Sequence, residues 1–202
     1  MAANAEVLIV GDVTDATAAS VRAQLKLASR AQRIDVVVSS FGGSVTAGWG
    51  IVAALRAHPG RKVARVEGVA ASIASAIVAA ADRVVVTEGS LVMIHQPSAF
   101  ETSGTAAELR RTADVLDRVQ NDLVTLYARR TGKPEEVIVG WLEAETWFSA
   151  AEAVAAGFAD EVAGQAVRMA AHVDPAKYGF KRVPDELMRP RYQAAAALLR
   201  KL

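Results

Sequence analysis

Runs of β-branched residues alternate with segments of helical periodicity in the first part of the chain, and this alternation constrains the fold most. The runs "EVLIVGDV", "RIDVVVSS" and "KVARVEGV" begin at Glu6, Arg33 and Lys62, and such runs are typical of buried strands. The segment after the first run places Val21 and Leu25 at helical spacing. Strand and helix in alternation predict an α/β fold with parallel strands, right-handed crossovers and functional groups at the carboxyl ends of the strands.

The second half of the chain continues the pattern and adds one long helix. The stretch "RVVVTEGSLVMIHQP", from Arg83, predicts two short strands around a turn. A long amphipathic helix is predicted to follow and to end at Gly132. Its apolar stripe consists of Leu109, Ala113, Leu116, Val119, Leu123 and Leu126. The helix is longer than a small sheet can cover, so we expect it to overhang and to make subunit contacts. That it only folds over the sheet remains the alternative. Two short helices, "KPEEVIVGWLE" and "SAAEAVAAG", complete the pattern.

The most apolar stretch, "VEGVAASIASAIVAAADRVVV", begins at Val66 and does not fit a membrane span. Its uncharged part, from Val69 to Ala81, is shorter than the roughly 20 residues that a span needs, and Glu67 and Asp82 bound it. Its alanines and serines are typical of a helix packed tightly inside a protein. The N-terminus lacks the basic and apolar regions of a signal peptide. We therefore expect a cytoplasmic protein without a membrane partner.

Charge and composition exclude several classes of function. The formal net charge of +1 gives no reason to expect a nucleic-acid partner. The chain has no cysteine and only three histidines, so we expect no metal site and no cysteine nucleophile. His58 and His172 lie in charged, loop-like contexts and receive no role. No cofactor is predicted.

The last forty or so residues differ in character from the rest. From Gln165 to Leu202 the chain has eight Lys or Arg and three Asp or Glu, and prolines divide it into short pieces. The final "RYQAAAALLRKL" allows only a short terminal helix. We predict a domain over residues 1–163 and a basic C-terminal extension over 164–202, which docks on its own domain or on a neighbouring subunit. A basic arm for nucleic acid is the less favoured alternative.

Two glycines and a serine follow predicted strands at the same edge of the sheet. Gly42 and Gly43 come directly after "DVVVSS", where they let the backbone approach a ligand and turn its N–H groups outward. Ser72 stands near the first turn of a predicted helix, beside the unpaired N–H of Ile73. Its hydroxyl can attack a carbonyl while that N–H helps to hold the negative oxygen. Ser75 is a rival nucleophile, although the N–H groups around it are bonded within the helix.

His95 supplies a base at the same edge. It ends the hydrophobic run "LVMIH", and Pro97 forces the chain to turn. A lone histidine on an apolar strand is usually a core residue. Here it shares the strand edge with Gly43 and Ser72, and a neutral imidazole there can take the serine's proton and return it to a leaving amine.

Together these residues resemble the Clp-type serine peptidases, that is, the proteolytic subunits of Clp proteases and their phage head-maturation relatives. "GGSVTAG" is similar to the oxyanion loop of that family, "GVAASIAS" to its nucleophile helix and "MIHQP" to its histidine motif. "WFSAAEAVAAGFADEV" is similar to its closing helix and turn. The resemblance covers roughly residues 6–163. It implies a crotonase-like fold of repeated βαβ units with a protruding handle helix, and a homo-oligomeric ring, or two stacked rings, that encloses unfolded polypeptide substrates.

The resemblance also implies a catalytic triad and an oxyanion hole. Ser72 would be the nucleophile and His95 the base, and the N–H groups of Gly43 and Ile73 would bind the oxyanion. The family's third member is an aspartate, and counting along the closing motif places Glu145 at its position. Glutamate is one methylene longer but can still accept the imidazole N–H. Asp160, Glu101 or a dyad without an acid remain alternatives.

Two further expectations concern the kind of peptidase. The first strand begins almost at once, at Glu6, without the longer N-terminal segment of subunits that work with an ATPase. This favours the phage-type branch, which acts on precursor polypeptides without an unfoldase, and it leaves an ATPase partner open. The other functions considered are a catalytically inactive ring or scaffold subunit, for which Glu145 would mark a decayed site, and a crotonase-type acyl-CoA enzyme.

Overall fold

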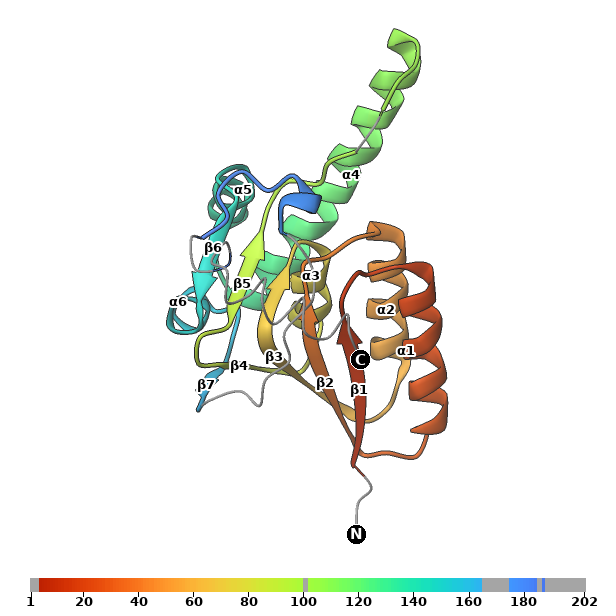
Figure 1. Cartoon of the computed structure of the whole chain (residues 1–202), viewed down its shortest axis with the longest axis vertical. Helices are drawn as coiled ribbons and strands as arrows, with labels where there is room; N and C mark the ends of the chain where they lie inside the picture. The colour runs from red at the N-terminus through yellow and green to blue at the C-terminus, as the bar shows by residue number, and fades with distance from the viewer. Residues whose placement is uncertain (1–3, 100–101, 165–174, 185–186, 188–202) are drawn as a thin grey trace, which may run out of the picture.

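The computed structural model describes residues 4–99, 102–164, 175–184 and 187. Within these residues the chain forms one twisted sheet of seven strands, with helices packed on it (Figure 1). The strands are β1 (Asn4–Val10), β2 (Arg33–Ser40), β3 (Arg61–Ala71), β4 (Arg83–Thr87), β5 (Leu91–Ile94), β6 (Thr146–Ser149) and β7 (Glu161–Ala163). Strands β1, β2, β3, β4 and β7 lie in this order and are parallel. The predicted α/β fold with parallel strands is confirmed.

Strand β3 belongs to two parts of the sheet. Its first half pairs with β4, and its last residues pair with β5, with Val69 opposite Leu91 and Ala71 opposite Met93. This pairing is parallel, so the chain leaves β3 and β5 at neighbouring points of one edge. The residues that follow the two strands, Ser72 and His95, are thereby brought together.

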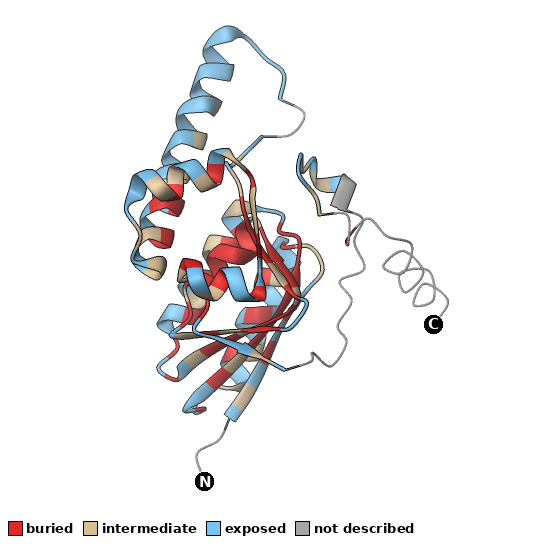
Figure 2. Cartoon of the chain, turned by 90° about the vertical axis from the view of Figure 1, so that its left-hand side faces the viewer, coloured by how far each residue is buried: buried red, intermediate tan, exposed pale blue. Residues whose placement is uncertain are grey.

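Helices cover one face of the sheet. They are α1 (Asp15–Leu27), α2 (Val45–Ala57), α3 (Ile73–Ala79), α4 (Ala106–Thr131), α5 (Glu135–Glu143) and α6 (Ala150–Ala156). In Figure 2 α1, α2 and α3 lie on one side of the strands. Thr14 caps α1 and Thr105 caps α4, each by accepting a hydrogen bond from a backbone N–H of the first turn. The helix boundaries lie within a few residues of those predicted.

The side chains of β3 point alternately to the two faces of the sheet and so contribute to two separate hydrophobic clusters. Ala70 points into the large core beneath the helices, whereas Val69 and Ala71 belong to a smaller cluster on the opposite face. Phe41 and Met93 complete the floor of this second cluster, and both are buried. Its cover comes from the C-terminal extension, which contributes Tyr178, Phe180, Val183 and Leu187.

The long helix α4 protrudes from the body, as the sequence predicts (Figure 1). Its buried residues, Leu123, Val124, Leu126 and Tyr127, all lie in the last third. Nearer its start, Leu109 and Val115 are 43% and 57% exposed. Gly132 then ends the helix with a φ of 69°. No residue of α4 before Leu123 is buried by the described part of the chain.

Two short strands were not predicted. Strand β6 pairs with β5 in antiparallel fashion, and β7 joins the far edge at β4. Segments of three or four residues are too short to show a period in the sequence.

The predicted terminal helix "RYQAAAALLRKL" lies outside the described residues. None of the described helices combines the length and apolar character that crossing a membrane requires.

Candidate active site

Ser72 stands where β3 ends and α3 begins, in a backbone conformation that is unusual for serine. Its φ is 54° and its ψ is −131°. The N–H of Ser72 donates to the carbonyl oxygen of Met93 over 3.0 Å, which ties this turn to β5. Non-glycine residues in such conformations cost about 1–3 kcal/mol and are concentrated at functional sites. The turn leaves Ser72 half-buried instead of covered.

His95 lies beside this hydroxyl. Its Nε2 atom is 2.8 Å from Ser72 Oγ, a distance typical of a strong hydrogen bond. Burial lowers the pKa of His95 below its ordinary value, and the negative charge of Glu145 opposes this shift. The imidazole is therefore kept neutral near neutral pH, which is the form that can accept the serine's proton.

Two glycines bring the preceding loop against the serine. A Cβ atom on Gly42 would lie 2.7 Å from Ser72 Cβ, and one on Gly43 would lie 2.4 Å from the carbonyl oxygen of Val13. Both glycines also have positive φ angles, of 107° and 142°. The sequence predicts a role for the N–H of Gly43. The close approach of Gly42 to Ser72 is seen only in the structure.

Two N–H groups next to this turn have no acceptor among the described residues. Gly43 is exposed, and no described residue accepts a hydrogen bond from its N–H or from that of Ile73. Ile73 directly follows the serine and opens α3, where backbone donors have no intrahelical partner. The candidate oxyanion groups and the hydroxyl are therefore carried by the same turn and the loop packed on it.

Ser75, the rival nucleophile, is buried and fully engaged. Its hydroxyl donates to the carbonyl oxygen of Ser72 over 2.6 Å and lies 2.8 Å from the hydroxyl of Tyr127. Tyr127 is itself buried, which raises the pKa of its phenol. Ser75 therefore supports the nucleophile's turn from below.

Glu145 is buried in the turn between α5 and β6. It has a φ of 49°, and only 8% of it is exposed. Its carboxylate accepts hydrogen bonds from the backbone N–H groups of Lys181 and Arg182, each over 2.7 Å, and from Trp147 Nε1 over 3.3 Å. No hydrogen bond joins it to His95 among the described residues, although its charge acts on the imidazole.

The other predicted acids lie elsewhere. Asp160 accepts from the backbone N–H of Val84, near the start of β4, and pairs with Arg130 at 2.5 Å. These bonds place it at the far end of the strands from His95. Glu101 lies outside the described residues. Glu145 is therefore the acid for which the structure shows an effect on the imidazole.

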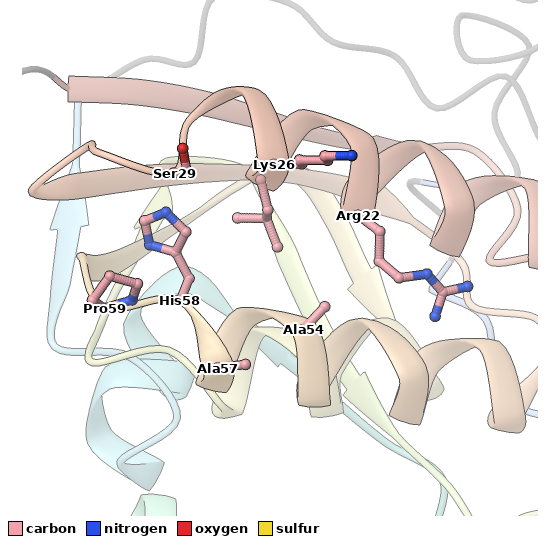
Figure 3. A pocket seen from close by; sticks show the side chains of 8 residues that line it. Arg22, Lys26, Ser29, Ala54, Ala57, His58 and Pro59 are labelled. Carbon is pink, nitrogen blue, oxygen red and sulfur yellow. The ribbon is translucent and has the colours of Figure 1, made fainter.

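The other histidines are not near this site. His58 is buried, accepts from the N–H of Gly60 at Nδ1, and pairs through Nε2 with the carbonyl oxygen of Ala28. It lines an open pocket of about 300 Å³ between α1 and α2 (Figure 3). Its ring nitrogens link the C-terminal ends of α1 and α2, so its role there is structural. His172 lies outside the described residues, which hold no cluster of three His, Cys, Asp or Glu suited to a metal ion.

Comparison with known proteins gives a consistent result. The family model described as Clp protease matches residues 1–166. The ATP-dependent Clp protease proteolytic subunit 3 of Rhodococcus jostii is 31% identical, over 86% of this chain and 88% of its own length. The ATP-dependent Clp protease proteolytic subunit of Pleurastrum terricola is 30% identical, over 79% of this chain and 83% of its own length. Subunit 1 of Chlamydia caviae is 33% identical, over 74% and 82%.

Proposed function

The chain belongs to the Clp protease family, and we propose that Ser72, His95 and Glu145 form the catalytic triad of this serine peptidase. The observation that carries the proposal is the 2.8 Å distance between His95 Nε2 and Ser72 Oγ. Residues from two strand ends are in hydrogen-bonding contact there, beside two N–H groups without acceptors among the described residues. The reaction supported by this arrangement is acyl transfer from a peptide bond to serine and then to water.

The steps follow from the positions of these atoms. Ser72 Oγ attacks the peptide carbonyl as its proton passes to Nε2 of the neutral His95, and the tetrahedral oxygen is held by the N–H groups of Gly43 and Ile73. One such donor typically lowers the barrier by about 3 kcal/mol. The imidazolium then gives its proton to the leaving amine, and water releases the acyl group by the same route in reverse.

Glu145 is proposed to stabilise the imidazolium that forms in each step. Its charge already opposes the effect of burial on the His95 pKa, so it favours the protonated ring. Glu145 lies in a turn with a positive φ, and we propose that its side chain, one methylene longer than that of aspartate, acts on the imidazole from there through its charge. A carboxylate in this place fixes the ring and stabilises its charge without itself being protonated.

Assembly is proposed to depend on α4. The exposed part of this helix presents Leu109 and Val115 to solvent, at 43% and 57% exposure. We expect the helix to pack between subunits of a homo-oligomeric ring, or of two stacked rings, that encloses polypeptide substrates. Residues 1–163 would form the peptidase domain and residues 164–202 the extension.

We also propose that the enzyme acts without an ATPase, as in phage head maturation. The relatives in the comparison are named ATP-dependent subunits, so this point needs its own experiment. The purified protein should cleave an unstructured polypeptide without nucleotide or partner, and Ser72→Ala should not. Cleavage that appears only when a Clp ATPase and ATP are added would exclude it.

A further inference from the structure

The C-terminal extension returns to the active site. Lys177 Nζ donates to Asp12 over 2.8 Å, and the Tyr178 hydroxyl donates to the same carboxylate. These bonds lower the pKa of Asp12 despite its partial burial, which alone would raise it. Leu187 is buried in the second hydrophobic cluster. Figure 2 shows this segment on the side of the sheet opposite α1, α2 and α3. The segment is thus anchored on both sides of Lys181 and Arg182.

Between these anchors, two consecutive backbone N–H groups bind the proposed triad acid. Lys181 N–H donates to Glu145 Oε2 and Arg182 N–H to Oε1, so each carboxylate oxygen receives one bond from the backbone of this segment. Hydrogen bonds to a charged acceptor are about twice as strong as neutral ones. Lys181 and Arg182 are themselves exposed, so the contact depends on main-chain donors and not on their side chains.

The same segment restrains the base. The ring of Phe180 meets that of His95 edge to face, with centroids 5.3 Å apart. It makes a second edge contact with Trp147 at 5.7 Å and stacks on Tyr178 at 5.4 Å. Such aromatic pairs prefer edge-to-face or offset geometries, so the chain of rings limits how the imidazole can turn.

The segment does not close the site. Ser72 remains half-buried and Gly43 exposed while Phe180 lies on His95, so the hydroxyl and an oxyanion donor stay open to a substrate. Contact is made with the acid and the base. These contacts are those expected of a segment that supports the triad and does not block the access of a substrate to Ser72.

We infer that residues 177–183, here called the C-terminal clamp, position the triad of this enzyme. The N–H groups of Lys181 and Arg182 hold the Glu145 carboxylate. Phe180 packs against the His95 imidazole, whose charge that carboxylate is proposed to stabilise. A glutamate has one more rotatable bond than the aspartate of the family, and the two N–H bonds restrict that added freedom. The inference rests on the proposed triad and assigns Lys181 and Arg182 as positioning residues.

Proline substitutions test the clamp because proline has no backbone N–H. Lys181→Pro and Arg182→Pro should each lower kcat for peptide cleavage by about 10- to 100-fold, with KM little changed, because the acid is misplaced by about an ångström. Lys181→Ala and Arg182→Ala keep the N–H and are the matched controls, with kcat within about twofold of wild type. Equal losses in the alanine and proline variants would overturn the inference, and so would a proline variant faster than wild type.

A double-variant cycle separates positioning from general destabilisation. In a Glu145→Ala background the proline substitutions should lower kcat much less than in the wild-type background, because the two N–H groups that they remove act through that carboxylate. Losses that multiply with that of Glu145→Ala would contradict the inference. If the wild-type enzyme itself cleaves no peptide and reacts with no serine-directed probe, the proposed function fails instead, so the two failures are distinguishable.

Hydrogen exchange gives a measurement that does not depend on the folding of a proline variant. In the wild-type protein the amides of Lys181 and Arg182 should be protected, and Glu145→Ala should make them exchange at least about tenfold faster. Amides that exchange freely in the wild-type protein would show that the clamp does not form in solution and would overturn the inference.

Discussion

The hydroxyl of Ser75 donates to the carbonyl oxygen of Ser72 over 2.6 Å, from one turn deeper in the same helix. The backbone N–H of Ser75 donates to the same oxygen over 2.9 Å. Two bonds therefore fix the turn that gives Ser72 its positive φ. The serine that competes with Ser72 in the sequence thus becomes, in the structure, its support.

Ser75→Ala should weaken the fold but keep the nucleophile's turn, because the backbone N–H of Ser75 still donates to the carbonyl oxygen of Ser72. The change leaves the buried hydroxyl of Tyr127 without its partner, so the free energy of unfolding should fall by about 1–3 kcal/mol. Ser29→Ala, at an exposed position, is the control and should leave stability unchanged. Denaturant unfolding measures both. A stable Ser75→Ala variant that no longer cleaves peptides would instead indicate that Ser75 reacts.

Gly43→Ala should lower kcat/KM by about 100-fold or more, because it moves an oxyanion donor. The added Cβ would lie 2.4 Å from the carbonyl oxygen of Val13, at a φ that favours glycine. Gly140→Ala is the matched control, since nothing lies within 4 Å of its Cβ in α5. It should raise stability by about 0.5–1 kcal/mol and leave activity intact. Normal cleavage by Gly43→Ala would remove that residue from the site.

The pH dependence of kcat/KM should report the lowered pKa of His95. The imidazole must be neutral to accept a proton, so activity should persist below pH 6.5 and fall as the pH drops through the His95 pKa. Glu145 raises that pKa, so Glu145→Gln should move the acid limb to still lower pH and reduce the maximum rate.

The control for this shift is Glu143→Gln, which removes the same charge from an exposed position two residues away. Its acid limb should coincide with that of wild type. An acid limb above pH 6.5 in the wild-type enzyme, or a limb that rises in Glu145→Gln, would be inconsistent with the proposed roles of both residues.

Charges on the protruding part of α4 should weaken self-association. Leu109→Glu and Val115→Glu should each raise the dissociation constant of the assembly by about tenfold or more, as for truncation of a central interface residue. Leu27→Glu, at a position 90% exposed on α1, is the control. Analytical ultracentrifugation measures the mass distribution. Mass distributions of Leu109→Glu and Val115→Glu that equal that of wild type would exclude the protruding part of α4 as the interface.

The parallel sheet and the pairing of Ser72 with His95 could be predicted because both depend on local patterns. β-Branched runs marked the strands, and the carboxyl ends of neighbouring parallel strands meet at one edge. The position of Glu145 required resemblance to a family, since nothing in its immediate sequence distinguishes it from Glu143. Its place in the triad stays a prediction.

The clamp could not be predicted, for a physical reason. Residues 177–183 have neither helical nor strand periodicity, and Lys181 and Arg182 appear in the sequence as part of a basic surface. Their contribution comes from backbone N–H groups, which every residue except proline carries. Only the docking of Tyr178 and Phe180 on Phe41 places those groups at Glu145. Such a contact depends on the tertiary structure alone.

The most direct test of the site is covalent labelling with a fluorophosphonate followed by mass mapping of the modified residue. We expect the wild-type protein to be modified at Ser72, Ser72→Ala to lose both modification and peptide cleavage, and Ser75→Ala still to be modified at Ser72. Modification of a different residue, or undiminished cleavage by Ser72→Ala, would contradict it.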